Sequence, residues 1–281
     1  MNVLIFGRAS NFGVDTIRKR HNVRHIIDIS NITIPFPFNG KLYYGQEEIN
    51  CSDYDCALFF QKGKTSNYIF RVLENHICVL GDPYVRSVMR DKLLSAVVMA
   101  NAGLPVIEST FCSSTNHNLS LINADRIVGK PIDGAFGQGI WLSNKESVKN
   151  LIDANYILQP YIECNSSDER LHIVGGKLVC AMFRYSEKKG EFRSNIDLGG
   201  KAKNLELTEE RHNIAKRIAE CFPNHLIIGA DILRGLDGKW YVGEVNGQPL
   251  DVIIDVTGHN FYEDVSIYIE EEAKKWLQKN S

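Results

Sequence analysis

The chain has 281 residues, which is enough for two or three small domains or one large domain. Lysine and arginine total 32 against 34 aspartate and glutamate, so the chain lacks the strong positive charge of a nucleic-acid-binding protein. The apolar run Val3–Phe6 is too short for a signal peptide, and no later run is long enough to cross a membrane. These features predict a cytoplasmic protein with neither a nucleic-acid nor a membrane partner. The seven cysteines include no CxxC pair, which favours reduced thiols over disulfides or a zinc site.

The first 85 residues are expected to form a parallel α/β unit. Continuous apolar strands separated by helices are typical of a small parallel sheet that is covered on both faces. The turn Gly81-Asp82-Pro83 is expected to close this unit. The predicted strands are 3–6, 23–29, 56–60 and 77–80, and the predicted helices are 14–20 and 68–75.

A single helix is predicted over Val85–Ala102, because Gly103 and Pro105 form a stop signal just beyond it. The pattern then changes to strands and glycine turns, which indicates an α+β architecture. We expect domain boundaries near residues 85 and 160, giving units 1–85, 86–160 and 161–281. The predicted elements are strands 127–130, 140–142 and 156–159, hairpins 170–174/177–184 and 227–233/240–245, and helices 209–221 and 261–279.

Three oxygen-bearing side chains fall on the second of these hairpins. Glu244 and Asn246 are two residues apart on one strand and therefore share a face, while Asp231 lies on the partner strand. Carboxylate and amide oxygens suit Mg²⁺. The alternative is a solvated hairpin face with incidental acids, but the apolar neighbours of Asp231 argue against it.

A lysine and a glycine-rich loop follow one another in the middle of the chain. Lys130 lies on a strand that runs into a loop containing Gly134, Gly137 and Gly139. Glycine lets backbone N–H groups close around phosphate oxygens, and lysine adds a positive charge. The loop lies between two strands, so it is neither a P-loop nor a dinucleotide-binding turn. A flexible turn without a ligand remains the alternative.

Arginines gather in the segment after residue 168. Arg170 and Arg184 are predicted on facing strands of the first hairpin, and Arg193 and Asn195 follow. Clustered guanidinium groups require an anion, such as a phosphate, an acyl phosphate or a substrate carboxylate. Salt bridges with the nearby acids are the alternative; these acids are Glu187, Glu191 and Asp197. Lys92, expected in an early helix turn, would by itself be read as part of a basic helix surface.

Taken in order, these motifs resemble the ATP-grasp superfamily, in its RimK-like carboxylate–amine ligase branch. The resemblance covers roughly residues 86–250 and rests on several motifs in one order, which is more specific than any single motif. After Asn246 the family usually continues with a small residue and Pro-Gly, whereas this chain reads Gly247-Gln-Pro-Leu250. The motifs are Lys92, Gly103-Leu-Pro105, Lys130-Pro with its glycine loop, Gln159-Pro-Tyr161-Ile162-Glu163, Asp168-x-Arg170, Arg184, Phe192-Arg193-x-Asn195, Asp231 and Glu244-x-Asn246.

The resemblance implies an ATP-grasp fold with an N-terminal pre-ATP-grasp domain, and it assigns roles to these residues. Lys92 and Lys130 would bind the ATP phosphates, and the loop Gly134–Gly139 would close over them and would be mobile without nucleotide. The Gln159–Ile162 backbone, including Tyr161, would meet adenine, Glu163 would hold the ribose, and Asp168 would belong to the nucleotide site. One or two Mg²⁺ ions, with Mn²⁺ as an alternative, would bind Asp231, Glu244 and Asn246.

The implied reaction joins a carboxylate to an amine through an acyl phosphate. Arg184 would stabilise the oxyanion, and Arg193 and Asn195 would orient the substrate together with Arg170. The substrates would be an amino acid, a peptide or a small carboxylate, and the product an amide or an ester. Dimers or tetramers are common in the family, which leaves a homo-oligomer open. The alternatives are a kinase-like phosphotransferase of the same fold and a non-catalytic nucleotide-binding module.

Overall fold

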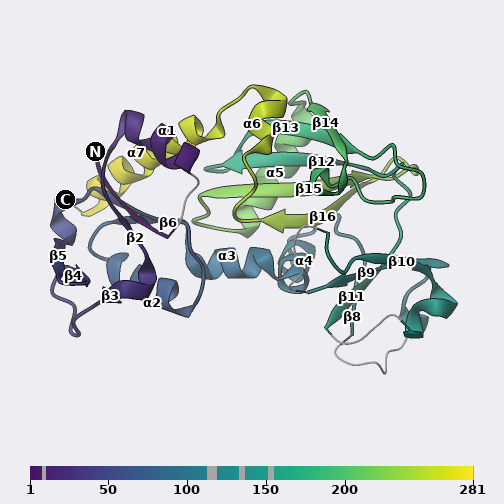
Figure 1. Cartoon of the computed structure of the whole chain (residues 1–281), viewed down its shortest axis with the longest axis horizontal. Helices are drawn as coiled ribbons and strands as arrows, with labels where there is room; N and C mark the ends of the chain where they lie inside the picture. The colour runs from purple at the N-terminus through teal and green to yellow at the C-terminus, as the bar shows by residue number, and fades with distance from the viewer. Residues whose placement is uncertain (8–10, 113–118, 133–136, 151–154, 281) are drawn as a thin grey trace.

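The structure, a computed structural model, describes residues 1–7, 11–112, 119–132, 137–150 and 155–280. Within these ranges the strands form four sheets. Figure 1 shows an elongated molecule in which the N-terminal sheet lies at one end, a five-stranded sheet in the middle and a smaller sheet at the other end. None of the described helices is long and apolar enough to span a membrane.

The N-terminal sheet is parallel, as predicted, and has the strand order β2-β1-β6-β7. Alternate residues of β1 face opposite cores, because side chains alternate along a strand. Val3 and Ile5 pack with α1 and α7, whereas Leu4 and Phe6 pack with α2 and a small three-stranded sheet. The elements are β1 (Asn2–Phe6), α1 (Asn11–Arg20), β2 (Asn22–Ile27), β3 (Ile32–Thr33), β4 (Lys41–Tyr44), β5 (Glu47–Asn50), β6 (Cys56–Phe59), α2 (Lys64–Leu73), β7 (Cys78–Leu80) and α7 (Phe261–Asn280).

The single helix predicted over Val85–Ala102 is wrong, because the structure has two helices there, α3 (Pro83–Arg90) and α4 (Lys92–Asn101). Asp91 separates them with extended backbone angles, and its side chain accepts hydrogen bonds from the N–H groups of Leu93 and Leu94, both at 2.9 Å. An aspartate in this position caps the start of a helix. Lys92 therefore becomes the first residue of α4 instead of an interior residue of a longer helix.

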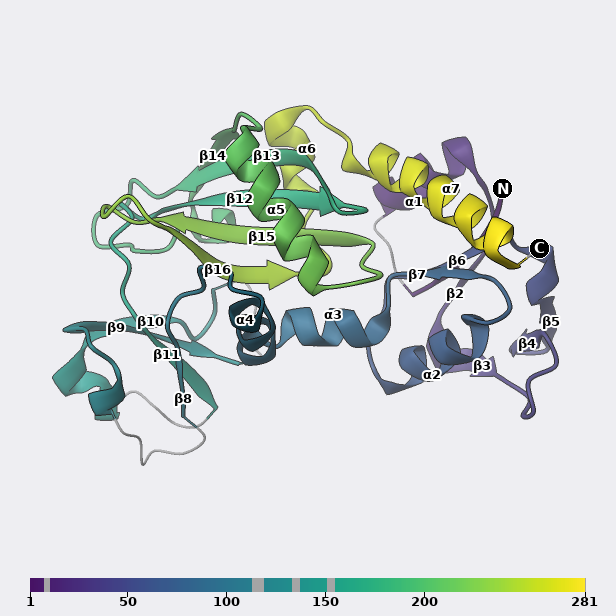
Figure 2. The same cartoon turned by 180° about the vertical axis from the view of Figure 1, so that it is seen from behind.

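The five-stranded sheet is antiparallel and has the order β14-β13-β12-β15-β16. Both predicted hairpins are confirmed in it, and the predicted helix 209–221 is α5. The second antiparallel sheet, with the order β10-β9-β11-β8, lies beyond α4 in both views (Figures 1 and 2). The elements are β8 (Thr110–Cys112), β9 (Arg126–Pro131), β10 (Trp141–Asn144), β11 (Tyr156–Pro160), β12 (Ser167–Val174), β13 (Lys177–Tyr185), β14 (Lys201–Asn204), α5 (Glu209–Cys221), β15 (Ile227–Arg234), β16 (Trp240–Asn246) and α6 (Val252–Thr257).

Helix α7 carries the chain back to the N-terminal sheet, so the first and last described residues lie at the same end of the molecule (Figure 1). One apolar core includes Val3 and Ile5 of β1, Met182 of β13 and Phe261 of α7. Sequence-distant segments are therefore packed together around this core. The predicted domain boundaries near residues 85 and 160 stay a prediction.

Candidate functional site

A cavity of about 410 Å³ lies between the five-stranded sheet and the sheet formed by β8–β11. Several lining residues lie two apart on the same strand, such as Val128 and Lys130, because a strand directs alternate side chains to one face. Fourteen predicted site residues line it. They are Lys92, Lys130, Gly137, Gln159, Tyr161, Ile162, Asp168, Arg170, Arg184, Arg193, Asn195, Asp231, Glu244 and Asn246.

Two predicted residues that the structure describes, Glu163 and Gly139, are not among those that line the cavity. The carboxylate of Glu163 forms an ion pair with Arg126 at 3.5 Å, and half of its side chain is exposed. Gly139 lies against Pro131, where an added Cβ would come within 3.1 Å of the proline ring. Gly134 lies outside the described residues, as does the part of the glycine loop at 133–136, so the predicted mobility of the loop stays a prediction.

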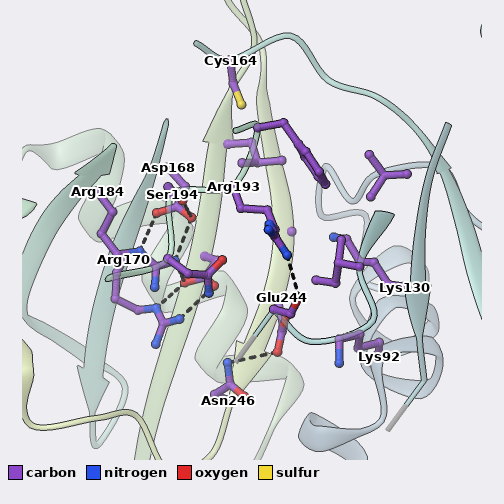
Figure 3. Close-up of a pocket in the computed structure, with 18 of the residues that line it drawn as sticks. Lys92, Lys130, Cys164, Asp168, Arg170, Arg184, Arg193, Ser194, Glu244 and Asn246 are labelled. Carbon is purple, nitrogen blue, oxygen red and sulfur yellow. Dashed lines mark hydrogen bonds and ion pairs between the residues drawn. The ribbon is translucent and has the colours of Figure 1, made fainter. Parts of the chain in front are cut away.

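The two lysines reach the cavity from α4 and β9. Figure 3 shows Lys92 and Lys130 close together, facing Glu244 and Asn246 on β16. Burial lowers the pKa of Lys130, and the nearby Lys92 lowers it further, while the carboxylate of Glu244 opposes both effects. Two adjacent ammonium groups beside a cavity of this size suit an anionic ligand such as a polyphosphate.

A chain of ion pairs connects the side chains of the cavity wall that is formed by β12, β13 and β15. Arg184 donates to Asp168 through Nε and Nη2, both at 2.7 Å, and its Nη2 lies 2.9 Å from Oδ1 of Asp231. Asp231 also accepts two hydrogen bonds from Arg170. The hydroxyl of Ser194 donates to Asp168 at 2.6 Å. Arg170 and Arg184, which were predicted to meet an external anion, are therefore already paired with two carboxylates of the chain itself, Asp168 and Asp231. Of the three acids that the sequence offered as alternatives, Glu191 pairs with Arg193.

This network keeps Asp231 ionised. Burial acts to raise the pKa of Asp231, but the guanidinium groups of Arg170 and Arg184 outweigh it and lower the pKa to about 2. A carboxylate offers about four lone-pair positions, and the described arginine N–H groups occupy three of those on Asp231. One position is left for a further ligand.

The predicted magnesium ligands lie on adjacent strands. Asp231 and Glu244 are opposite each other in the β15–β16 ladder, and the side-chain amide of Asn246 donates to Glu244 at 3.3 Å. Two carboxylates and an amide oxygen lining one cavity are the donor types that a magnesium ion takes together with water and phosphate oxygens. Within the described ranges, no cluster of three or more histidine, cysteine, aspartate and glutamate side chains offers a competing metal site.

Arg193 connects the glycine loop to the cavity. Its Nε and Nη2 each lie 2.8 Å from an oxygen of Glu191, and its Nη1 donates to the carbonyl of Gly137 at 3.1 Å. The hydrogen bond from Arg193 lowers the pKa of Glu191 to about 2. Gly137 has φ +70°, and an added Cβ would come within 3.4 Å of the Asn195 side chain. A larger residue at 137 would therefore be strained and crowded.

Sequence reasoning missed the apolar walls of the cavity. Val128 lies two residues before Lys130 on β9, and Met182 lies two before Arg184 on β13, so each pair shares a strand face. The same period-two spacing could have indicated them. Flat apolar walls beside a charged region suit a ligand that has both an aromatic and an anionic part. The apolar lining residues include Ile107, Val128, Ile140, Met182, Phe192 and Leu233.

Comparisons with known proteins show which proteins this chain is similar to. The RimK-like ATP-grasp domain model matches residues 89–267. A probable alpha-L-glutamate ligase of Alkalilimnicola ehrlichii is 29% identical over 98% of this chain and 97% of its own length. A protein of the same description from Syntrophotalea carbinolica is 34% identical over 66% of this chain and 64% of its own length.

Solved structures share the fold. The ATP-grasp ligase PsnB in complex with a minimal precursor superposes with a TM-score of 0.72 at 14% identity, covering 96% of this chain and 98% of that one. The D-alanine–D-alanine ligase of Bacillus anthracis, complexed with ATP, gives a TM-score of 0.64 at 16% identity, covering 100% and 99%. At these low sequence identities, the likeness shows that the proteins share a fold and shows nothing of their substrates.

Proposed function

The chain belongs to the RimK-like ATP-grasp family of carboxylate–amine ligases, and from this premise we propose that the cavity between the two sheets binds ATP and activates a carboxylate for attack by an amine. The observation that carries the proposal is that two lysines and the oxygen donors Asp231, Glu244 and Asn246 line one cavity. ATP and free thiols are both typical of the cytoplasm, where we place the reaction. All seven cysteines are unpaired.

ATP would lie with its base between the apolar walls and its phosphates beside the lysines. Lys92 and Lys130 would neutralise the phosphates, with Gly137 and Gly139 in the loop above them. Gln159, Tyr161 and Ile162 line the cavity and would meet the base, and the side chain of Gln159 is held by donating to Ser109 at 2.8 Å. Glu163, which pairs with Arg126, would have to turn toward the ribose to bind it.

Asp231, Glu244 and Asn246 would hold one or two Mg²⁺ ions, or Mn²⁺ in their place. When bound, the metal would neutralise phosphate charge as a Lewis acid. Asp231 would contribute its remaining lone pair while Arg170 and Arg184 keep it ionised and oriented, and Asp168 would hold Arg184 in turn. The buried ion-pair chain thus positions the donor set.

The reaction would proceed in two steps. An oxygen of the substrate carboxylate would attack the γ-phosphorus, the bond to ADP would break, and an acyl phosphate would form. The amine nitrogen would then attack the acyl carbon, lose a proton and release phosphate. Arg193 and Asn195 lie beside the glycine loop, where they would orient the acyl phosphate, and Arg184 would stabilise the oxyanion.

The relatives named as probable alpha-L-glutamate ligases favour an amino acid as one substrate. The neighbour PsnB forms a complex with a precursor peptide, so a peptide is the other candidate substrate. We propose an amide product, and its resistance to mild alkaline hydrolysis distinguishes it from an ester.

The test is incubation with Mg·ATP and pools of acids and amines, with phosphate release and product mass as readouts. Ligation predicts ADP and phosphate only when both an acid and an amine are present. Phosphate transfer to one substrate alone would indicate the kinase-like alternative, and binding of ATP without any turnover would indicate a non-catalytic module.

Glu244→Gln is expected to reduce turnover by at least about 100-fold, because an amide is a poor replacement for a metal-binding carboxylate. Glu220→Gln, at an exposed position on α5, is the matched control and should keep full activity. Thermal melting should show that both variants fold. Wild-type turnover in a folded Glu244→Gln variant would refute the metal assignment.

A further inference from the structure

One carboxylate in the large cavity has no role in the scheme above. Asp197 lines this cavity, and its carboxylate forms no hydrogen bond or ion pair with another residue in the described ranges. It is one of the three acids that the sequence offers as partners for the clustered arginines. Glu191 pairs with Arg193, and Glu187 pairs with Lys201. Of the three acids, Asp197 is therefore the one without a cationic partner in the part of the chain that the structure describes.

The other carboxylates in the described wall of the cavity already have a role. Asp168 and Asp231 accept hydrogen bonds from arginines that line the same cavity. Glu244 faces the two lysines and belongs to the proposed metal site (Figure 3). A carboxylate that lines a reaction cavity and has no partner within the described residues is suited to a cationic ligand. Asp197 is thus the candidate for binding a positively charged reactant.

The backbone holds Asp197 at a fixed place in the cavity wall. It lies in the short 3₁₀ turn Ile196–Leu198, where the N–H groups of Leu198 and Gly200 both donate to the Asn195 carbonyl at 3.1 Å. A Cβ added to Gly200 would lie 2.8 Å from that same carbonyl oxygen, so the turn is packed as closely as a glycine permits. A side chain on such a support is positioned before its ligand arrives.

The neighbours of Asp197 connect this turn to the core and to the glycine loop. Ile196 packs against the core that α6 shares with β13, and α6 itself packs on β13 and β14 (Figure 1). On the other side, Cδ1 of Leu198 lies 3.2 Å from the position of a Cβ added to Gly137. Asn195, which would orient the acyl phosphate, precedes Asp197 by two residues and lines the same cavity. The acid is therefore close in the chain to the group proposed to hold the reacting intermediate.

Among the reactants of the proposed ligation, the amine is the one that carries a positive charge. ATP, the substrate carboxylate and the acyl phosphate are anions, which the lysines and arginines of the cavity attract and a free carboxylate repels. An alkyl amine is protonated at neutral pH, and it has to lose two protons before it becomes an amide nitrogen. The reaction therefore needs a group that attracts the amine and accepts a proton, and the scheme above assigns no residue to this task.

We propose that Asp197 binds the attacking amine and accepts the proton that the nitrogen loses as the amide forms. The protonated amine first loses one proton to water, and its lone pair then attacks the acyl carbon. The C–N bond forms, the bond from carbon to the phosphate oxygen breaks, and phosphate leaves with the electron pair. The second proton passes from nitrogen to a carboxylate oxygen of Asp197 and from there to water.

A carboxylate is a sufficient base for this second proton, because a nitrogen bonded to the acyl carbon is far more acidic than a free ammonium ion. This assignment rests on the proposed ligase function and adds a catalytic residue to the same site.

Hydroxylamine separates formation of the acyl phosphate from the attack of an amine. It is largely uncharged at neutral pH and traps acyl phosphates as hydroxamates without the help of a base. The probe is an equimolar pool of the proteinogenic amino acids with Mg·ATP, in which each molecule offers both a carboxylate and an amine. Mass spectrometry measures the rate of peptide formation without hydroxylamine and the rate of hydroxamate formation with it.

Asp197→Asn should lower the rate of peptide formation at least about tenfold, because the amide is uncharged and accepts no proton. The rate of hydroxamate formation should change by less than about twofold, which would also show that the variant is folded. Asp197→Glu should recover part of the peptide rate, since it restores a carboxylate. Asp255→Asn, at an exposed position on α6 outside the cavity lining, is the matched control and should form both products like wild type.

Equal losses of both products in Asp197→Asn would indicate a structural role, and an unchanged peptide rate would show that Asp197 neither binds the amine nor takes its proton. Hydroxamates without peptides from the wild type would mean that the site does not bind these amines. Each of these results would overturn the assignment of Asp197 and leave the ligase proposal standing, because hydroxamates report the acyl phosphate. Absence of both products in the wild type would overturn the ligase proposal and this one with it.

Discussion

At the scale of the residue, the surroundings of Lys130 in the cavity affect its protonation. It lies two residues after Val128 on β9, in a partly apolar wall, and burial and Lys92 both lower its pKa while Glu244 raises it. Only the protonated amine attracts a phosphate. Since the pKa of Lys130 is lowered, the free enzyme loses this charge at a lower pH than it would with an ordinary lysine at the same place.

The KM for ATP is therefore expected to rise with pH, starting below the ordinary lysine pKa and by up to about tenfold per pH unit beyond the midpoint. Lys130→Arg should remove the rise, because arginine stays charged throughout the range. Steady-state kinetics at a series of pH values give the KM for ATP of the wild type and of the Lys130→Arg variant. Lys188→Arg, at an exposed position, should keep the wild-type profile. A flat wild-type profile up to the ordinary lysine pKa would contradict the role of Lys130.

At the scale of elements, the packing of strand β9 against strand β10 depends on a glycine. A Cβ added to Gly129 would lie 2.1 and 2.3 Å from two atoms of the Trp141 ring on the neighbouring strand β10. The indole therefore packs closely against Gly129, on the strand face opposite to the one that carries the cavity residues Val128 and Lys130. Any side chain at 129 has to displace the ring or the strand.

Gly129→Ala should lower the free energy of unfolding by about 1–3 kcal/mol through overpacking and raise the KM for ATP, because Lys130 moves with the strand. Urea unfolding measures the free energy, and steady-state kinetics measure the KM. Gly243→Ala is the matched control for stability, since a Cβ there meets only atoms at 3.4 Å or more, and it should change the unfolding free energy by less than about 0.5 kcal/mol. Equal effects of the two substitutions would count against this packing argument.

At the scale of the molecule, the C-terminal helix joins the two ends of the chain. Phe261 at the start of α7 is fully buried and contacts the ring of His172 on β12 with centroids 4.9 Å apart. Further along α7, Ser266 accepts a hydrogen bond from the ring of His21 at 3.0 Å, and Glu270 pairs with Arg20. The helix therefore holds the N-terminal α/β unit against the five-stranded sheet.

Phe261→Ala should lower the free energy of unfolding by about 3–5 kcal/mol, because it leaves a cavity in a core that both units share. Leu277→Ala, on the same helix but 48% exposed, should cost far less. Denaturant unfolding followed by fluorescence measures the difference. If Phe261→Ala lowers the free energy of unfolding no more than Leu277→Ala, the packing of α7 does not stabilise the contact between the two units.

The sequence by itself determined the features that depend on neighbours along the chain. Glycine-containing turns predicted both hairpins, and the predicted helix 209–221 has the bounds of α5. The order of the motifs predicted the ATP-grasp fold, and the spacing Glu244-x-Asn246 placed two oxygen donors on one strand face. The small sheet β3–β5 and the strands β8 and β14 were not predicted, because short strands carry little periodic signal.

Only the tertiary structure decided which groups neutralise one another. Arg170 pairs with Asp231, 61 residues away, and no local pattern specifies such a partner. The break at Asp91 could have been recognised as a helix cap, yet the apolar pattern continues across it. A cavity of about 450 Å³ is likewise lined by α3, by the ends of parallel strands and by the segment after Asn246, which are far apart in the sequence. Pairings over long separations depend on how whole elements pack, and packing is a property of the folded chain rather than of any segment.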